Sequence, residues 1–208
     1  MKKYMLGTLC AILLIAAPAG AAPSVNGSTG MINNPTAAVL QEGQISLGYY
    51  HLKDGRVGVF DANIGGHMEV GVAGFRYNDR EDKNCVNAKW GIVPETILTP
   101  GLAVGAEDIA NTDKRTLYAV ASKSLPFGFR LHVGMGNGRY DGVFAGIEKT
   151  VNPIGMITGS NTFPATTFMA EYDGHGMNYG ARLSIVPGVK LDAGYRQHQT
   201  CFGVSFTN

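Results

Sequence analysis

Histidine is the side chain in this sequence best suited to bind a metal ion or to act as a catalytic base. The chain contains five histidines, and none is paired with Cys or another His at the spacing of a metal site. The motifs HEXXH and CXXC are absent. We therefore expect no metal site and no cofactor, and we place the histidines mainly in surface loops: His51, His67, His132, His175 and His198.

A nucleophile beside a histidine would indicate a hydrolase or acyltransferase that modifies membrane lipid. His198 and Ser205 lie on one predicted strand but too far apart to hydrogen-bond, and His175 with Ser184 is no better. The motif GXSXG is absent. The glycine-rich stretch 134–138 lacks the Lys-Ser/Thr pair and the helix of a phosphate loop, so it predicts a hairpin turn. We expect no catalytic residues, and a lipid-modifying enzyme remains the third alternative.

The segment 172–196 alternates between apolar and polar residues in a way that predicts two strands. Tyr179 and Leu183 fall on one side of an extended chain and Arg182 on the other, and the alternation resumes after the turn at Pro187-Gly188. A period of two across so tight a turn predicts a hairpin with one apolar and one charged face. In a soluble sandwich the charged face would lie outside, whereas in a membrane barrel it would line the lumen.

Similar alternating runs recur along the chain and predict an all-β fold. Glycine accounts for 29 of 208 residues, and helix-length stretches free of Gly, Pro or Asn are scarce. The predicted strands lie near 44–51, 55–62, 66–77, 84–93, 101–109, 115–123, 128–136, 139–149, 165–173, 177–186, 188–196 and 200–207. We therefore predict an antiparallel up-and-down transmembrane β-barrel of about 12 strands, with 10 as the lower bound.

The N-terminus predicts export. Lys2 and Lys3 precede an uncharged run and then small residues, so residues 1–21 are expected to be a cleaved signal peptide. Residues 22–43 are rich in turn formers and predict an irregular lead-in that either plugs the barrel or lies against its rim, followed by the barrel at 44–208. The balance of 17 basic and 16 acidic residues offers no basic patch for nucleic acid. Beyond the leader no apolar run is long enough for a spanning helix.

Charged side chains that share the inward phase of the predicted strands form the candidate site. Both signs are present, so these residues can pair across a narrow lumen. Either they hold the barrel together as a structural network, or they line a path for small solutes. The set comprises Lys89, Glu107, Arg130, Glu148, Glu171, Arg182, Lys190, Asp192 and Arg196, and His132 shares its phase.

The outward phase contains aromatic residues that gather near the two ends of the strands. Such girdles mark the two borders of the lipid layer. The first group is Tyr172, Tyr179, Tyr195 and Phe202, and the second is Trp90, Phe129, Phe168 and Phe206. In a soluble sandwich these rings would instead pack in the core.

Two cysteines lie in the barrel, at Cys85 and Cys201, and both face inward near the same end. Periplasmic folding permits a disulfide. Their strands are four apart around the barrel, however, so a bridge requires the strand ends to fold over the opening.

Several stretches resemble the YjbH-type exopolysaccharide- or capsule-associated outer-membrane proteins. These are 27–44, 104–112, 118–138, 141–149 and 168–183, in the order that family uses. The most distinctive residues are Gly27, Gly30, Pro35 and Thr36, together with the EYDG at 171–174. The longer members run to several hundred residues, so this chain corresponds to a short single module.

The resemblance implies a non-enzymatic outer-membrane barrel with an accessory role in export or assembly of extracellular or capsular polysaccharide. The expected partners are outer-membrane lipid and polysaccharide-export proteins of the periplasm or outer membrane. Segments 27–43 and 152–164 are expected to contact the export proteins. A small-solute channel with a charged lumen is the alternative.

Overall fold

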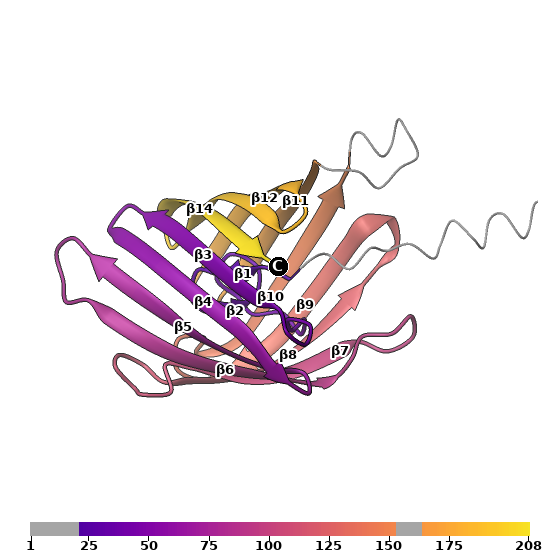
Figure 1. The fold of residues 1–208 in the computed structure, drawn as a ribbon, viewed down its shortest axis with the longest axis horizontal. Helices are drawn as coiled ribbons and strands as arrows, with labels where there is room; N and C mark the ends of the chain where they lie inside the picture. Colours follow the sequence, from indigo (N-terminus) through magenta and orange to yellow (C-terminus); the bar gives the residue numbers. More distant parts are fainter. Residues whose placement is uncertain (1–20, 153–163) are drawn as a thin grey trace, which may run out of the picture.

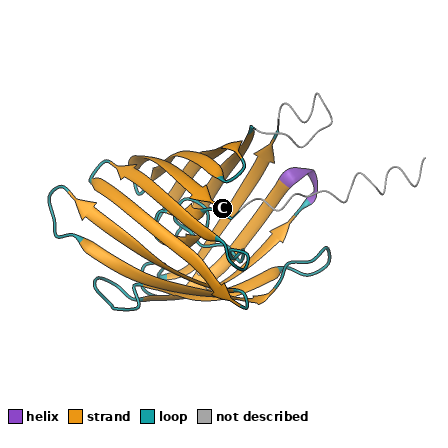
Figure 2. Ribbon diagram, viewed as in Figure 1, coloured by secondary structure: helices purple, strands orange, loops and turns teal. Residues whose placement is uncertain are grey.

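The fold is a closed β-barrel, and the structure, a computed structural model, describes residues 21–152 and 164–208. Its twelve strands are antiparallel to their neighbours (Figures 1 and 2). They are β3 (Ile45–Leu52), β4 (Gly55–Gly65), β5 (Met68–Tyr77), β6 (Lys83–Val93), β7 (Gly101–Glu107), β8 (Thr116–Ser124), β9 (Phe129–Gly136), β10 (Gly142–Val151), β11 (Ala165–Tyr172), β12 (Met177–Val186), β13 (Val189–Arg196) and β14 (Gln199–Thr207). The predicted twelve-stranded barrel is confirmed.

Closure comes from the pairing of the last strand with the first. β14 pairs with β3 from Cys201 opposite Leu52 to Thr207 opposite Ser46. Every barrel strand therefore has two neighbours, and the sheet has no free edge whose N–H and C=O groups would lack partners in lipid. Among the described residues, no helix has the length and apolar content needed to cross a membrane.

The alternation of side chains separates the lumen from the outer surface. On β4, Val57 and Val59 are buried inside the barrel, whereas Phe60, between Val59 and Asp61, is 40% exposed on the outside. Successive side chains of a strand point to opposite faces, so one polar and one apolar set follow directly from the sequence. The exposed rings also exclude the alternative of a soluble sandwich with these aromatics in its core.

The hairpin connections divide the barrel into two ends. We call one end the mouth; it bears the connections 53–54, 78–82, 108–115, 137–141, 173–176 and 197–198. The other end, the base, bears the connections 66–67, 94–100, 125–128 and 187–188 and the C-terminal Asn208. The connection at 125–128 contains a short 3-10 helix, η2 (Pro126–Gly128). At the mouth, Gln197 and His198 have φ of 48° and 65°, the backbone of a type I′ turn that suits a two-residue hairpin.

The N-terminal segment lies inside the barrel. We call residues 22–43 the plug; it contains the short strands β1 (Pro23–Ser24) and β2 (Gly27–Thr29), which pair with each other. From Ala22 to Thr36 every residue is buried except Asn26, which is partly buried. Figure 1 shows β1 and β2 in indigo within the ring of strands. The plug has no charged residue before Glu42.

Apolar side chains of the plug and of the wall pack together in the lumen. Met31 and Ile32 belong to one buried cluster with Tyr50 and Phe75 of the wall. Ala37 packs against a second, which contains Tyr118 among others. The lumen therefore has the packed interior of a small protein domain, with the plug as part of its core.

Candidate functional site

The nine predicted lumen residues all lie on inward positions of the wall. Five of them are buried, namely Lys89, Glu107, Glu171, Arg182 and Lys190. The other four are partly buried, namely Arg130, Glu148, Asp192 and Arg196. Their ion pairs involve several residues that the sequence reading did not include.

The pair Lys89 and Glu69 anchors the plug near the base. Their Cα atoms are register partners on β6 and β5, and Lys89 Nζ lies 3.4 Å from Glu69 Oε1. Glu69 accepts hydrogen bonds from the backbone N–H and the hydroxyl of Thr29, both at 2.6 Å, and from the N–H of Leu40 at 3.1 Å. Lys89 donates to the carbonyl of Thr29 at 2.8 Å. Two buried charges are thus satisfied by each other and by one neutral segment.

Arg182 of β12 binds the plug through its backbone carbonyls. Its Nη1 donates to Gly30 at 3.0 Å, and its Nη2 donates to Met31 at 3.1 Å and to Pro23 at 3.3 Å. Its Nε is paired with Asp192 Oδ1 at 2.6 Å across the β12–β13 hairpin. The fixed fork of a guanidinium suits this simultaneous recognition of a carboxylate and several carbonyls.

Asn33 is the point where the plug meets the mouth. Its N–H donates to Glu171 and its side-chain amide to Asp173, at 2.7 and 2.8 Å. Its carbonyl accepts from Arg139 at 2.8 Å, and its side-chain oxygen accepts from Arg196 at 2.9 Å. Asn33 alone therefore hydrogen-bonds to two carboxylates and two guanidinium groups.

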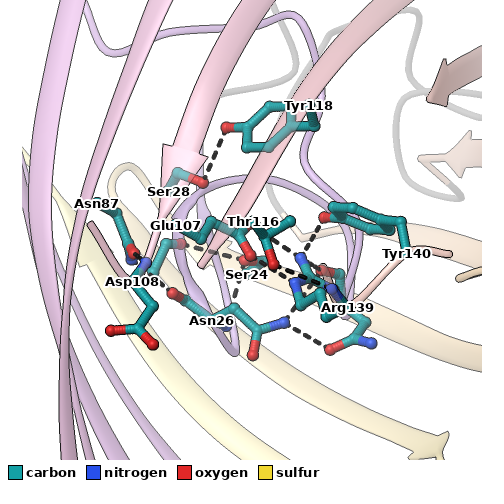
Figure 3. Close-up of polar contacts among 12 residues, drawn as sticks. Ser24, Asn26, Ser28, Asn87, Glu107, Asp108, Thr116, Tyr118, Arg139 and Tyr140 are labelled. Carbon is teal, nitrogen blue, oxygen red and sulfur yellow. Dashed lines mark hydrogen bonds and ion pairs between the residues drawn. The ribbon is translucent and has the colours of Figure 1, made fainter. Parts of the chain in front are cut away.

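Arg139, in the 137–141 turn, joins the plug to two mouth residues. It is paired with the carboxylate of Glu107 and contacts the hydroxyl of Tyr140 (Figure 3). Burial acts to lower the pKa of Arg139, but the carboxylate of Glu107 outweighs it and the pKa is raised. Figure 3 also shows Asn87 donating to the carbonyl of Asn26, at 2.7 Å. The guanidinium of Arg139 therefore stays protonated at neutral pH.

The predicted family-motif residues form the bend of the plug. Gly27 has φ of +105°, a backbone that L side chains rarely adopt. Gly30 forms a β-bridge with Pro35, and the N–H of Thr36 donates to the carbonyl of Thr29 at 3.2 Å. The motif therefore shapes the plug so that Asn33 reaches the mouth.

The predicted aromatic girdles lie on the outer face of the barrel. All eight girdle aromatics face outward and are at least 40% exposed, Tyr172, Tyr179, Tyr195 and Phe202 toward the mouth and Trp90, Phe129, Phe168 and Phe206 toward the base. Exposed Tyr49 and Phe60 were not in the predicted girdles. The predicted 152–164 segment lies outside the described residues except at its two ends.

Three sequence-based expectations need correction. Cys85 and Cys201 are free buried thiols rather than a disulfide, because they lie on β6 and β14 with three strands between them. His132 is not in a surface loop: it is buried on β9, with Nδ1 2.7 Å from Ser122 Oγ and Nε2 3.4 Å from Glu148. His51 is also on a strand, β3, and is exposed.

The third correction concerns residues 27–43, which were expected to contact export proteins. Residues 27–36 lie in the lumen, because the wall offers charged partners for their backbone groups. Only the end of the plug is exposed, at 41–43.

The sequence reading missed Glu69 and Arg139, for different reasons. Glu69 shares the inward phase of Ala73 and Phe75 on β5, so the alternation could have found it. Arg139 lies in a turn, where no alternation assigns a direction. In the parts of the chain that the structure describes, no three His, Cys, Asp or Glu side chains are grouped to hold a metal ion.

Together, the closed sheet, the apolar exterior and the filled lumen define a plugged β-barrel of the outer-membrane type. The chain belongs to the YjbH family, described as exopolysaccharide biosynthesis protein YbjH, whose model matches residues 24–163. Its assignment to that family from the sequence is therefore confirmed.

Two known proteins illustrate what the chain is similar to. It is 29% identical to "Uncharacterized lipoprotein YjbH" of Escherichia coli (strain K12), in a match that covers 63% of this chain and 21% of that protein. The chain thus spans about a fifth of the length of the curated relative it matches. A solved structure titled "KdgM porin in complex with disordered oligogalacturonate" has the same fold, with a TM-score of 0.54 and 11% identity, covering 79% of this chain and 97% of the porin.

Proposed function

We propose that this chain is an outer-membrane β-barrel closed by its own plug, and that it has a non-enzymatic accessory role in export or assembly of an exopolysaccharide. Residues 1–21 would serve as a cleaved signal peptide. The family description and the porin-like fold support the envelope setting and the link to polysaccharide. Its partners would be outer-membrane lipid and polysaccharide-export proteins.

The observation that carries the accessory role is the neutral plug in a charged lumen. Glu69, Glu171 and Arg182 use the backbone of residues 23–40 to satisfy their hydrogen-bonding groups. A polymer passing through the barrel would have to displace this segment and leave buried charges without those partners, at a cost of several kcal/mol. The barrel therefore suits an anchor or an assembly factor better than a permanent conduit.

Secretion and conductance together test this proposal. A strain that lacks the protein should release less exopolysaccharide, and the wild-type chain should restore release. Wild-type protein in planar bilayers should conduct almost no current. Restored secretion by a chain that conducts nothing supports the accessory role, whereas normal secretion by the deletion strain overturns it.

The small-solute channel is favoured instead if the wild-type barrel carries a steady current. That current should then change when Glu171 or Arg182 is neutralised, because both side chains line the lumen. Glu81→Gln, in the exposed 78–82 loop, is the control for loss of a charge outside the lumen.

A further inference from the structure

A cavity of about 220 Å³ opens at the mouth, above the tip of the plug. Its walls come from the plug, from the strand ends of β3, β5, β6, β13 and β14, and from mouth loops. Four basic and two acidic side chains line it, so the lining residues carry a net formal charge of +2. The four basic residues are Arg80, Lys83, Arg139 and Arg196.

Three of the four basic side chains already have a carboxylate partner. Arg80 Nη2 lies 2.9 Å from Asp54 Oδ2, and Lys83 Nζ lies 2.7 Å from Asp113 Oδ2. Arg139 is paired with Glu107. The structure gives Arg196 no ion pair with any carboxylate of residues 21–152 or 164–208.

Arg196 is held in place but incompletely hydrogen-bonded. Its Nη2 donates to Asn33 Oδ1, whereas its Nε is buried and has no partner among the described residues. Nη1 of Arg139, whose Nη2 donates to the carbonyl of the same Asn33, is also buried and without a partner. A ligand in the cavity cannot reach these two buried N–H groups. Nη1 of Arg196, however, is neither buried nor hydrogen-bonded among the described residues, so it can donate to a ligand there.

The carboxylates that lie near the two arginines do not line the cavity. Glu171 and Asp173 do not line it, and both accept hydrogen bonds from Asn33 and from the side chain of Asn178. An accessible guanidinium N–H forms a strong, charge-assisted hydrogen bond with a carboxylate oxygen.

The remaining lining suits a sugar. Amide and hydroxyl groups of Asn26, Gln197, Gln199 and Thr200 surround the cavity, and such groups both donate to and accept from sugar hydroxyls. The cavity is smaller than the roughly 300 Å³ at which sites for larger ligands begin, so it fits one sugar unit rather than a long stretch of chain.

We infer that the mouth cavity binds a carboxylate-bearing sugar unit of an acidic polysaccharide, with Arg196 as the anion-recognising residue. This inference rests on the proposed role in exopolysaccharide export or assembly, and it names the class of polysaccharide that the barrel would bind. The plug supports the site, because Asn33 positions both arginines. The barrel would hold the polymer at its mouth while the lumen stays closed.

Isothermal titration calorimetry with the purified barrel in detergent micelles tests whether the cavity binds a carboxylate-bearing sugar. The probe is trigalacturonate, and the controls are its fully methyl-esterified form, which lacks the charge, and neutral maltotriose. Wild-type protein should bind trigalacturonate at least about tenfold more tightly than either control, and the affinity should fall as salt rises. The inference is overturned if all three sugars bind equally or if trigalacturonate does not bind. It is also overturned if inorganic phosphate binds as tightly as trigalacturonate.

Variants assign the binding to Arg196. Arg196→Gln should weaken trigalacturonate binding about tenfold or more, and Arg196→Lys should have an intermediate affinity, because it keeps the charge without the fork. Lys114→Gln, an exposed charge in the 108–115 loop outside the cavity, should leave affinity unchanged. Equal effects of Arg196→Gln and Lys114→Gln would overturn the assignment. Secretion by the deletion strain is measured separately, so loss of the binding site and loss of the export role remain distinguishable.

Discussion

The carboxylate of Glu171 on β11 accepts a hydrogen bond of 2.7 Å from the backbone N–H of Asn33, which lies 138 positions earlier in the chain. The same carboxylate accepts from the N–H of Asn34 at 3.2 Å and from the side chain of Asn178 at 3.1 Å. A buried charge is thus stabilised by uncharged donors, two of them from the plug. This contact holds the tip of the plug under the mouth.

Replacing Glu69 with Gln should loosen the plug. The change removes the charge that is paired with buried Lys89 and replaces one acceptor oxygen that Thr29 or Leu40 uses. Breaking a buried pair by removing one partner costs about 3 kcal/mol or more. Urea unfolding of the barrel in lipid vesicles should show this loss. Glu81→Gln, in an exposed loop, should unfold like the wild type, and equal stability of the two variants would contradict the anchoring role of Glu69.

Gly134→Ala should destabilise the packed lumen. A Cβ at Gly134 would overlap the ring of Phe144, which is fully buried, and lie 2.7 Å from the carbonyl oxygen of Ala119. Overpacking of this kind costs roughly 1–3 kcal/mol. Gly58→Ala is the matched control, since a Cβ there meets no atom within 4 Å. Thermal unfolding midpoints should fall for the first variant only; a similar fall in both would point to a general effect of strand glycines.

Stability should fall at acidic pH in part through Asp173. Burial acts to raise its pKa, but the side chain of Asn178 and the backbone N–H groups of His175 and Gly176 donate to it and hold the pKa below its usual range. A carboxyl whose pKa is lower in the folded state stabilises the protein above its unfolded pKa, about 3.9, and loses this contribution as the pH falls through the folded value.

Unfolding midpoints measured from pH 7 to pH 2.5 should therefore show a smaller acid-side decline for Asp173→Asn than for the wild type. Between pH 5 and 7 position 173 should contribute no pH dependence to the unfolding midpoint of either protein. A decline of equal depth in both would exclude Asp173 as a source of acid sensitivity.

Trp90 should report contact with lipid. It is the only tryptophan of the sequence, and its side chain is 51% exposed on the outer face of β6. Phospholipids brominated in their acyl chains should quench its fluorescence in vesicles, while aqueous iodide should quench it weakly. The opposite order would place this surface in water.

Cys85 and Cys201 should behave as two protected thiols. Both are buried and unbridged, and burial keeps an alkylating reagent away from them. Peptide mapping without reductant should find neither residue modified by iodoacetamide in the folded barrel and both modified after boiling in detergent. A peptide linked through Cys85 and Cys201 would show that the bridge exists.

The sequence by itself determined which side chains face the lumen. Side chains on a strand alternate with a period of two, so Arg182 had to point away from the face of its neighbour Leu183, and the same rule applies on each strand. The even strand count and the two ends of the barrel followed from the positions of the turns. The same rule could have predicted that Glu69 faces the lumen, since it shares the phase of Ala73 and Phe75 on β5.

Only the tertiary structure decided what the lumen contains. Residues 22–43 have no charge before Glu42 and no alternation, so nothing local in them decides between a plug inside the barrel and a segment against its rim. The pairings Glu171 with Asn33 and Arg196 with Asn33 join positions more than 130 residues apart, and Arg139 acts from a turn whose direction no strand period sets. Such contacts depend on how the sheet closes and where the plug runs through it, and both are non-local properties of the folded chain.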